Sequence, residues 1–364
     1  MTARRFRALG LISGTSMDGI DAAIIDTDGS RVFGFHGALT HPYPDAVRTE
    51  LLAVARDPAK AELPLAELEA AVTKANAEAV NALLAASGIA LHTIDVVGMH
   101  GQTILHRPER RFTRQLGQGD VLSRMLGRDV VAGFRLADVA AGGQGAPFAP
   151  LYHAALAADL GRPLAVLNLG GVGNVTYLGT DLITAFDTGP ASAMIDDWVG
   201  KHLGLAYDAD GATAAKGNVN DAALAKLMDN PYFAAPAPKS LDRNDFPITP
   251  VEGLGVEDGA ATLTCFTAKS VAASLPHLPG APTRWLVTGG GRLNSTMMRM
   301  LREELGVPVD PVEAVGWRGD SLEAECFGFL AVRSLLGQPL SVPTTTGVPQ
   351  PMTGGVLFRA KDAA

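Results

Sequence analysis

The stretch Gly14-Thr15-Ser16-Met17-Asp18-Gly19 stands between two apolar runs, residues 6–12 and 20–25. This order is typical of a strand, a tight turn and a returning strand. Glycines let backbone N–H groups approach an anion closely, and the two hydroxyl side chains add donors. The acid would repel a bare phosphate, but it suits a phosphate that carries a magnesium ion. The stretch therefore indicates a turn that binds nucleotide phosphates, and an ordinary hairpin turn is the alternative.

The same turn resembles the nucleophile elbow G-x-S-x-G of hydrolases at its first three positions. Asp18 stands where that motif needs its second glycine, and the turn joins two strands rather than a strand and a helix. The chain also contains no Walker A sequence. These differences argue against a serine hydrolase and against a P-loop nucleotide site.

Length and composition point to an enzyme of two domains. The chain has 364 residues, which is too long for one compact core. Hydrophobic residues make up 47% and charged residues 19%, and the formal net charge of -8 argues against a nucleic-acid partner. Cys265 and Cys326 are isolated in helical-looking stretches, so neither a zinc site nor a disulfide framework is expected. A cytoplasmic protein is expected, since no signal peptide or membrane-spanning run is found.

A second polar group follows the strand expected at residues 94–99, namely His100-Gly101-Gln102-Thr103. Open α/β sheets bind ligands just past the carboxyl ends of their strands, so this group is a candidate ligand site. His100 is equally compatible with a loop histidine that bonds to backbone. His100 and His106 lack a third ligand at metal-site spacing, which argues against zinc.

The second half of the chain repeats the opening pattern. Residues 164–169 predict a strand, Gly170-Gly171-Val172-Gly173 a turn, and residues 174–178 the returning strand. A strand at 129–135 and the glycine-rich run 141–147, a mobile or ligand-contacting loop, precede this repeat, so the domain boundary is expected near residue 140. Two lobes of this kind that face each other would form a cleft with a glycine turn on each wall, where a polyphosphate could bind.

Two further sites follow in the second half. The strand expected at 182–186 ends at Asp187-Thr188-Gly189-Pro190, before a helix at 193–203. Asp187 is interpreted either as a helix-capping or turn residue or as a carboxylate base. The strand at 284–288 leads into Gly289-Gly290-Gly291 and a helix at 293–305, an order that favours binding of a nucleotide's phosphates or sugar on backbone.

Other segments are predicted to be helices or surface loops. Residues 31–35 are predicted to form a third strand, and residues from 339 onward a tail. Helices are predicted at residues 45–56, 65–86, 260–275 and 320–336. Residues 230–259 are expected to form a long surface excursion, in which Lys239, Ser240 and Arg243 could reach a ligand but are better read as solvated. Asp208-Ala209-Asp210-Gly211 lacks the acids of a calcium loop and is read as a turn.

Taken together, these motifs resemble the anhydro-N-acetylmuramic acid kinase family nearly from end to end. Each motif is short, and their order and joint occurrence make the match specific. The matching residues are Ser13 to Asp21; His100 to Thr103; Phe134-Arg135 with Asp138 to Pro147; Asn168 to Gly171; Phe186 to Pro190; Gly289 to Gly291 with Asn294; and Glu323-Ala324. Departures from the usual family pattern occur at Ala191-Ser192, Leu241-Asp242 and Gly328.

The resemblance implies an α/β fold of the actin, hexokinase and Hsp70 kind, a duplicated ribonuclease H-like fold with ATP in the cleft between two lobes. Residues 1–140, joined by the tail from about 340 to 364, would form the N-terminal lobe, and residues 141–340 the C-terminal lobe. The family also implies a homodimer, although no patch in the sequence indicates one.

The resemblance further implies an ATP- and Mg²⁺-dependent kinase that opens 1,6-anhydro-N-acetylmuramic acid with water and phosphorylates the released O6. Asp187 matches the family's catalytic aspartate. The first turn would bind the ATP phosphates, and Asp18 the metal ion. The nucleotide residues carried over are Gly14, Thr15, Ser16, Met17, Asp18, Gly19, Ile20, Asp21, Gly170, Gly171, Gly289, Gly290, Gly291 and Asn294; the sugar residues are His100, Gln102, Thr103, Arg135 and Glu323.

Two other functions remain open from the sequence. One is a kinase of the same superfamily that acts on an ordinary amino-sugar hydroxyl. The other is a non-enzymatic sugar sensor on the same fold. Such sensors usually carry an added DNA-binding helical module, whereas this acidic chain starts directly with its first strand.

Overall fold

A computed structural model describes residues 4–14, 16–241 and 245–360. It divides into two compact units, Met1–Ala158 with Ser321–Ala364, and Asp159–Asp320. The domain boundaries expected from the sequence lie elsewhere, near residues 140 and 340. The difference concerns two segments, 141–158 and 321–340, which the structure places in the first unit. No helix in the described part of the chain is long and apolar enough to cross a membrane.

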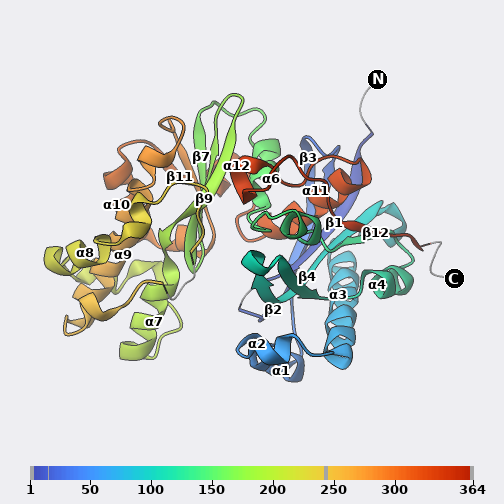
Figure 1. Ribbon diagram of the computed structural model, residues 1–364, viewed down its shortest axis with the longest axis horizontal. Coiled ribbons are helices and arrows are strands. Elements are labelled where there is room, and N and C mark those ends of the chain that lie inside the picture. Colours follow the sequence, from blue (N-terminus) through green and yellow to red (C-terminus); the bar gives the residue numbers. More distant parts are fainter. Residues whose placement is uncertain (1–3, 15, 242–244, 361–364) are drawn as a thin grey trace. The chain divides into compact units, whose positions relative to one another are not determined.

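The first unit is built on a mixed seven-stranded sheet in the order β12-β6-β4-β1-β2-β3, with β5 paired to β4 (Figure 1). Strands β1, β4 and β6 are parallel, whereas β2, β3, β5 and β12 join antiparallel to their neighbours. The strands are β1 (Phe6–Ser13), β2 (Gly19–Thr27), β3 (Val32–Pro42), β4 (Val96–Arg107), β5 (Phe112–Leu116), β6 (Val130–Ala132) and β12 (Val356–Phe358). The predicted hairpin at the start of the chain and the third antiparallel strand are confirmed.

Helices cover both faces of this sheet because side chains alternate along its strands. Leu9 and Leu11 of β1 belong to the core formed with α3 (Ala66–Ser87). Gly10 faces the other way, and a Cβ there would lie 1.8 Å from the carbonyl oxygen of Ala324 in α11 (Leu322–Leu335). Glycine is therefore required where α11 crosses β1. The remaining helices are α1 (Asp45–Ala55), α2 (Pro58–Ala61), α4 (Gly119–Leu126), α5 (Leu136–Ala140), α6 (Ala149–Leu156) and α12 (Pro343–Thr346).

The packing of α11 explains why the division between the units differs from the sequence-based boundary. The helix expected at residues 320–336 is present, but it packs on β1, β2 and β4 of the first sheet. Tyr152 of α6 donates a hydrogen bond to buried Glu325 of α11 at 2.7 Å, which ties α6 to the same unit. The segment after residue 339 is also more than a tail, since β12 pairs with β6.

The second unit repeats the first in its sheet order. Its five strands follow the order β11-β10-β7-β8-β9, which matches β6-β4-β1-β2-β3 in both pairing and direction. They are β7 (Leu164–Leu169), β8 (Val172–Leu178), β9 (Ile183–Pro190), β10 (Trp285–Thr288) and β11 (Val309–Pro311). Helices α7 (Ser192–Leu203), α8 (Asp221–Met228), α9 (Val256–Ala272) and α10 (Ser295–Leu305) surround a core that contains Trp198, Phe266 and Trp285. The internal repeat expected from the two hairpins is therefore present.

Three strand ends differ from the sequence-based prediction, and each difference changes the local structure at a predicted site residue. Strand β4 continues to Arg107, so His100–Thr103 lie inside a strand rather than after it. Gly101 has a positive φ of 78° and the register with β1 shifts nearby, so the strand is irregular at this point. Strand β6 ends at Ala132, because Gly133 turns the chain with φ 67°. Strand β9 runs to Pro190, so Asp187 lies within it.

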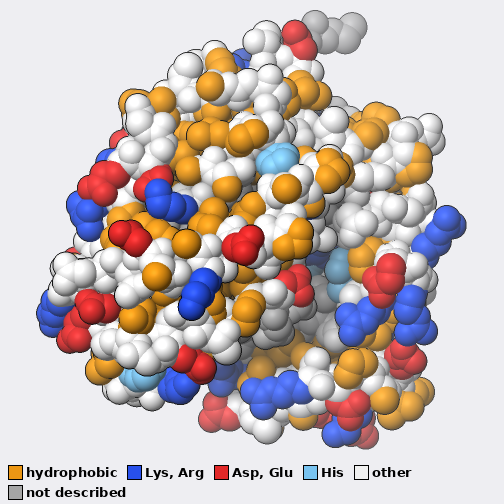
Figure 2. Space-filling view, turned by 60° about the vertical axis from the view of Figure 1, so that its left-hand side comes forward, with side chains coloured by type: hydrophobic (Ala, Val, Ile, Leu, Met, Phe, Trp, Pro, Cys, Tyr) orange, Lys and Arg blue, Asp and Glu red, His pale blue; other side chains and the backbone are white. Residues whose placement is uncertain are grey.

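Charged side chains of both signs lie on the surface, and both cysteines are buried. On the face in Figure 2, basic and acidic side chains are interspersed among apolar and uncharged ones. Cys265 lies in α9 and Cys326 in α11, the helical stretches expected from the sequence, and both are buried free thiols.

Candidate functional site

The turn between β1 and β2 presents an acid to solvent. Asp18 is exposed, and its Oδ1 accepts a hydrogen bond from Ser16 Oγ at 2.8 Å. Met17 is buried with φ 52°, and its N–H donates to the Gly14 carbonyl at 3.3 Å. Thr15 lies outside the described residues. The turn thus combines a backbone folded tightly on itself with an exposed carboxylate and hydroxyl.

Gln102 holds this turn from the neighbouring strand. Its side chain is buried, its Oε1 accepts a bond from Ser13 Oγ at 2.6 Å, and its Nε2 donates to the Gly14 carbonyl at 3.2 Å. The structure therefore brings Gln102, expected at the sugar, against the backbone of the turn that is predicted to bind phosphate. Beyond the turn, Ile20 is buried in the core and Asp21 accepts a bond from Thr40 Oγ1 at 2.5 Å.

Buried His100 pairs with the half-buried Arg135. Arg135 Nε donates to His100 Nε2 at 2.9 Å, and His100 Nδ1 lies 2.8 Å from the Gly101 carbonyl. Nδ1 must therefore carry the proton, because Nε2 accepts the guanidinium N–H. Burial, and then the charge of Arg135, lower the pKa of His100 well below its usual value. His100 is thus a neutral acceptor that orients Arg135.

The Arg135 guanidinium is held at a second point and remains charged. Arg135 Nη1 donates to the Gly145 carbonyl. Burial lowers the pKa of Arg135 to about 10, and the acid Glu323, at the start of α11, acts in the opposite direction. The two residues predicted for the sugar, Arg135 and Glu323, are therefore within electrostatic reach of each other.

The glycine-rich loop after α5 is ordered by buried polar side chains. Asp138 accepts bonds from the Gly145 N–H at 2.7 Å and from Thr346 Oγ1 at 2.6 Å. His106 Nε2 lies 2.9 Å from the Gln144 carbonyl, so it donates to that oxygen. These bonds fix the loop whose Gly145 carbonyl binds Arg135. Asp138 and His106 therefore support the candidate site, although the sequence marked neither as a site residue.

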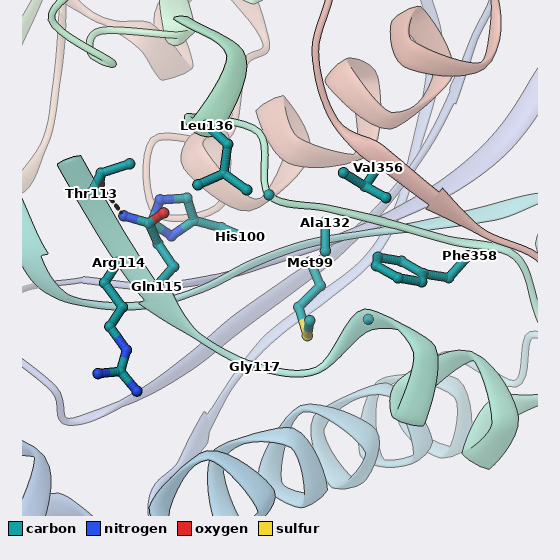
Figure 3. A pocket seen from close by; sticks show the side chains of 12 residues that line it. Met99, His100, Thr113, Arg114, Gln115, Gly117, Ala132, Leu136, Val356 and Phe358 are labelled. Carbon is teal, nitrogen blue, oxygen red and sulfur yellow. Dashed lines mark hydrogen bonds between the residues drawn. The ribbon is translucent and has the colours of Figure 1, made fainter. Parts of the chain in front are cut away.

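A cavity of about 230 Å³ opens beside this group of residues (Figure 3). Side chains of Met99, Ala132 and Leu136 line it together with Val356 and Phe358 of β12, and His100, Thr113, Arg114 and Gln115 add polar groups. Gln115 Nε2 bonds to Thr113 Oγ1 at 2.7 Å and to Thr103 Oγ1 at 3.3 Å. Sequence analysis missed β5 and β12, because three- to five-residue strands carry too short a pattern to detect.

In the second unit, Asp187 is a half-buried carboxylate on the edge strand β9. Its Oδ2 accepts a hydrogen bond from the Leu241 N–H at 2.9 Å, and Oδ1 has no partner among the described residues. Burial raises the pKa of Asp187 to about 6, and the Leu241 bond acts against that rise. Asp187 does not cap α7, whose N-cap residue is Ala191. The capping alternative is therefore wrong.

The glycine turns of the second unit lie together at the end of β7. A Cβ on Gly289 would lie 2.4 Å from Asn168 Oδ1, and one on Gly291 would lie 2.6 Å from Leu169 Cβ. Gly289 also has φ 76°, which favours glycine. The carbonyls of Gly170 and Gly171 accept bonds from Ser192 and Ala191 at the start of α7. Gly290 and Gly291 form a 3₁₀ turn, so this edge of the sheet is a backbone surface with few side chains.

Two polar side chains fix the triple-glycine turn. Asn294 Oδ1 accepts a bond from the Met297 N–H at 2.9 Å, so this side chain caps α10. Arg292 is buried, donates to the Gly289 carbonyl at 3.0 Å, and pairs with Glu313 and Asp320 at 2.9 and 2.7 Å. Arg292 was not among the predicted site residues. Its bonds to Gly289, Glu313 and Asp320 could not be predicted, because a single arginine after three glycines does not indicate its partners.

The candidate residues are thus divided between the two units. The first unit holds the Ser13–Gly19 turn with Gln102, and His100, Arg135 and Glu323 with Thr103 beside the cavity. The second holds Asp187 on β9 and, at the end of β7, the Gly170-Gly171 and Gly289–Gly291 turns with Asn294. The predicted residues Asp242 and Arg243 lie outside the described part of the chain.

Comparison with solved structures confirms the actin- and hexokinase-like α/β fold class. The chain is similar to component A of the (R)-2-hydroxyglutaryl-CoA dehydratase of Acidaminococcus fermentans, with a TM-score of 0.51. That match has 12% sequence identity and covers 91% of this chain and 99% of the other. At this identity the likeness concerns the fold alone.

Sequence comparison is far more specific. Residues 6–360 match the family model described as anhydro-N-acetylmuramic acid kinase. The curated relative of that name from Rhodospirillum rubrum is 54% identical over 356 residues, which cover 97% of this chain and 94% of the relative. The one from Acidiphilium cryptum is 53% identical over 365 residues, covering 98% and 99%. The chain therefore belongs to the anhydro-N-acetylmuramic acid kinase family.

Proposed function

We propose that this protein phosphorylates 1,6-anhydro-N-acetylmuramic acid with ATP and water, giving N-acetylmuramic acid 6-phosphate and ADP, in the cytoplasmic recycling of cell-wall fragments. The observation that carries the proposal is Asp187, a half-buried carboxylate on β9 with one oxygen held by the Leu241 N–H and the other without a partner among the described residues. Family membership supplies the substrate, and Asp187 supplies the base that this substrate requires.

The substrate needs a base because its O6 is locked in the 1,6-ether bridge. Water attacks the anomeric carbon and gives one proton to Asp187. The bond between C1 and O6 breaks with its electron pair going to O6, and O6 then attacks the γ-phosphorus of ATP. The bond from that phosphorus to the β–γ bridging oxygen breaks, and ADP leaves. Asp187 finally returns its proton to solvent, so the sugar product carries a hydroxyl at C1 and a phosphate at O6.

Asp187 is suited to this proton transfer. With a pKa raised to about 6, it is ionised at neutral pH and still basic enough to accept a proton. A positioned general base contributes about 10²- to 10⁴-fold in rate. The rest of the acceleration must come from the orientation of the reactants and from electrostatic stabilisation of the transferred phosphoryl group.

The turn from Ser13 to Gly19 fits a phosphate chain that carries Mg²⁺. Mg²⁺ prefers oxygen ligands and usually takes only one or two protein carboxylates, and Asp18 offers an exposed one. Bound there with ATP, the metal ion would neutralise charge on the transferred phosphoryl group. In the second unit, we assign the nucleotide to the backbone surface of Gly170-Gly171 and Gly289–Gly291, with Asn294 acting through the cap of α10.

The acceptor sugar fits the group around Arg135. A guanidinium matches a carboxylate, and Arg135 Nη2 makes no bond to the described residues, so it can bind the lactyl carboxylate. The adjacent ring carbon of the sugar carries the acetamido group. The cavity beside His100 offers that group an apolar floor of Met99, Ala132 and Leu136 and the amide of Gln115. Thr103 and Glu323 complete the proposed sugar contacts.

The proposal is tested by incubating the purified protein with ATP and the anhydro sugar in ¹⁸O-labelled water, followed by mass analysis. We expect a 6-phosphorylated product with ¹⁸O at the anomeric position and one ADP per product. Phosphorylation of N-acetylglucosamine-type sugars without label would favour the ordinary sugar kinase. Sugar binding without ADP release would favour the sensor. Light scattering of the same sample tests the homodimer that the family implies.

A further inference from the structure

The segment from Tyr232 to Leu241 covers the open edge of the second sheet at Asp187. Strand β9 is an edge strand, so its outward backbone groups need partners other than a strand. The Asp187 N–H donates to the Lys239 carbonyl at 3.0 Å, and the Asp187 carbonyl accepts from Tyr232 Oη at 2.6 Å. The Leu241 N–H binds the carboxylate itself. One segment therefore holds Asp187 at its backbone N–H, its carbonyl and its Oδ2.

Lys239 links the end of this segment to its beginning. Its Nζ donates to the carbonyls of Tyr232 at 2.9 Å and Phe233 at 3.3 Å. The same ammonium lies 4.6 Å from the centre of the Tyr232 ring and 5.9 Å from that of Phe186, the neighbour of Asp187. Lys239 is half-buried, and its ammonium contacts two backbone carbonyls and two aromatic rings of the protein itself. The solvated-loop interpretation of Lys239 does not describe this environment.

The other end of the segment is anchored in the core. The Phe233 ring meets Phe246 at 5.5 Å and Phe266 of α9 at 6.1 Å between ring centres. His277 Nε2 lies 2.7 Å from the Phe233 carbonyl, so it donates to the oxygen that Lys239 also binds. The Lys239 ammonium therefore connects a rigid aromatic anchor to the backbone that contacts Asp187.

We infer that Lys239 is a positioning residue for Asp187: it fixes the segment 232–241 so that the Leu241 N–H holds Oδ2 and Oδ1 faces the reacting water. This inference rests on the proposed function, because it assigns Asp187 the role of base. It names the device that orients the base, which neither the family match nor the sequence identifies. Tyr232 shares the task through its bond to the Asp187 carbonyl.

The first test replaces the ammonium and keeps the length of the side chain. In Lys239→Met, we expect kcat for the anhydro sugar to fall about 10- to 100-fold, since a displaced catalytic group loses rate on this scale. The KM for ATP should change little. The acid limb of the pH–rate profile should move up by about 0.5 pH unit, because loss of the Leu241 N–H removes a group that stabilises the carboxylate. Lys239→Arg, which keeps the cation, should recover most of the loss.

The charged and titratable groups around Asp187 allow this pH shift to be assigned. Tyr232 and Lys239 lie on the covering segment, Asp245 influences Tyr232, and His277 packs edge-on against Phe186 at 6.3 Å. The pKa of Tyr232 is raised and that of Lys239 is lowered, both mainly by burial. The comparison for this shift is Lys226→Met, which leaves all of these groups and their contacts in place.

Matched variants separate positioning from folding. Lys226→Met removes an exposed lysine of α8 in the same unit and should leave kcat and the acid limb unchanged. Tyr232→Phe removes one hydroxyl and should lower kcat in the same direction as Lys239→Met, with a smaller effect. Should Lys239→Met be poorly folded, Tyr232→Phe and Lys239→Arg still give the answer.

The inference is wrong if both Lys239→Met and Tyr232→Phe keep the wild-type kcat and the wild-type acid limb. It is also wrong if these variants have a lowered melting temperature but unchanged turnover per folded enzyme. Asp187→Asn distinguishes this failure from failure of the proposed function. If that variant is inactive while Lys239→Met is fully active, only the positioning role is lost. If Asp187→Asn turns over the sugar normally, the proposed function itself fails.

Discussion

Two carboxylates, Asp18 and Asp187, occupy opposite physical environments in the two units. Asp18 lies on the turn between the first two strands of its sheet, is exposed, and is touched by the hydroxyl of Ser16. Asp187 lies on the third strand of the matching sheet, is half-buried, and is held at its backbone and at one carboxylate oxygen. The same side chain thus appears once in water and once in a low-dielectric surrounding.

This difference determines which chemistry each acid can perform. An exposed carboxylate keeps its charge at little cost and can adjust its position to a hydrated metal ion on a phosphate chain. Burial disfavours the charged carboxylate, which makes it a stronger base, and rigid contacts aim it at one proton. We therefore assign metal and phosphate binding to the first hairpin and proton transfer to β9. Four predictions test this division of roles.

The largest effect is expected for Asp187→Asn. The amide cannot accept the proton of the attacking water, so kcat for the anhydro sugar should fall by at least about a hundredfold. ATP binding, measured by calorimetry or fluorescence, should be retained, because the phosphates are assigned to other residues. Near wild-type turnover of this variant would remove Asp187 from the role of base.

The fold was largely readable from sequence because its hairpins and long helices are strongly patterned. In α3, Leu68, Val72, Ala75, Ala79 and Leu83 recur every three or four residues, and all five are buried. What the sequence could not reveal was which sheet the helix at 322–335 covers. The position of this helix depends on Gly10 and Gly98, which are far away in the chain. Because these residues lack a Cβ, the helix backbone can pack directly on β1 and β4. Tertiary contact, rather than local propensity, therefore sets the division into units.

The candidate site was predictable as a set of motifs but not as a set of contacts. Gln102 was expected at the sugar, yet its amide binds Ser13 and the Gly14 carbonyl, because β4 runs on past the predicted strand end. Asn294 is a helix cap, and Asp138 and Arg292 brace glycine loops. The hydrogen-bond partner of a buried polar side chain is set by tertiary contacts. A single sequence therefore gives the residue type but not the bond that it makes.

The second prediction concerns Asp18→Ala. Loss of the exposed carboxylate should lower kcat/KM for ATP about 10- to 100-fold at low magnesium, because one oxygen ligand of the metal–phosphate complex is lost. Raising the magnesium concentration should restore part of this loss, whereas it should not restore Asp187→Asn. The measurement is a set of initial rates at varied ATP and magnesium. ATP kinetics that stay at wild-type values at low magnesium would contradict the metal role.

The third prediction is an acid limb near pH 6. Asp187 must be ionised to act, and burial raises its pKa to about 6, so kcat/KM for the sugar at saturating Mg–ATP should fall tenfold per pH unit below that value. The residual activity of Asp187→Asn should lack this limb, and that of Asp18→Ala should keep it. A limb near pH 4 in the wild-type enzyme would mean that the carboxylate is solvated during the reaction.

The smallest expected effect is on stability, and we expect it for Asp187 but not for Asp18. The folded-state pKa of Asp187 is about 6, above its ordinary value of 3.8, so the folded protein holds this proton more tightly than the unfolded chain does. Stability is therefore lost as the pH rises from about 4 to 6, and the full penalty is present at pH 7 and above. Asp187→Asn removes the charge and keeps an oxygen for the Leu241 N–H, so it should stabilise the protein by about 1–2 kcal/mol at pH 8.

This gain should shrink as the pH is lowered toward 4, because wild-type Asp187 then becomes neutral as well. Urea unfolding of both proteins at pH 8 and pH 5 measures the difference. Asp18→Asn is the matched control: its carboxylate is exposed, so the substitution should change stability little at either pH. Equal effects of the two substitutions would mean that Asp187 is not desolvated in solution. A pH-dependent gain confined to Asp187→Asn would show that the enzyme sacrifices stability to keep a basic carboxylate at this position.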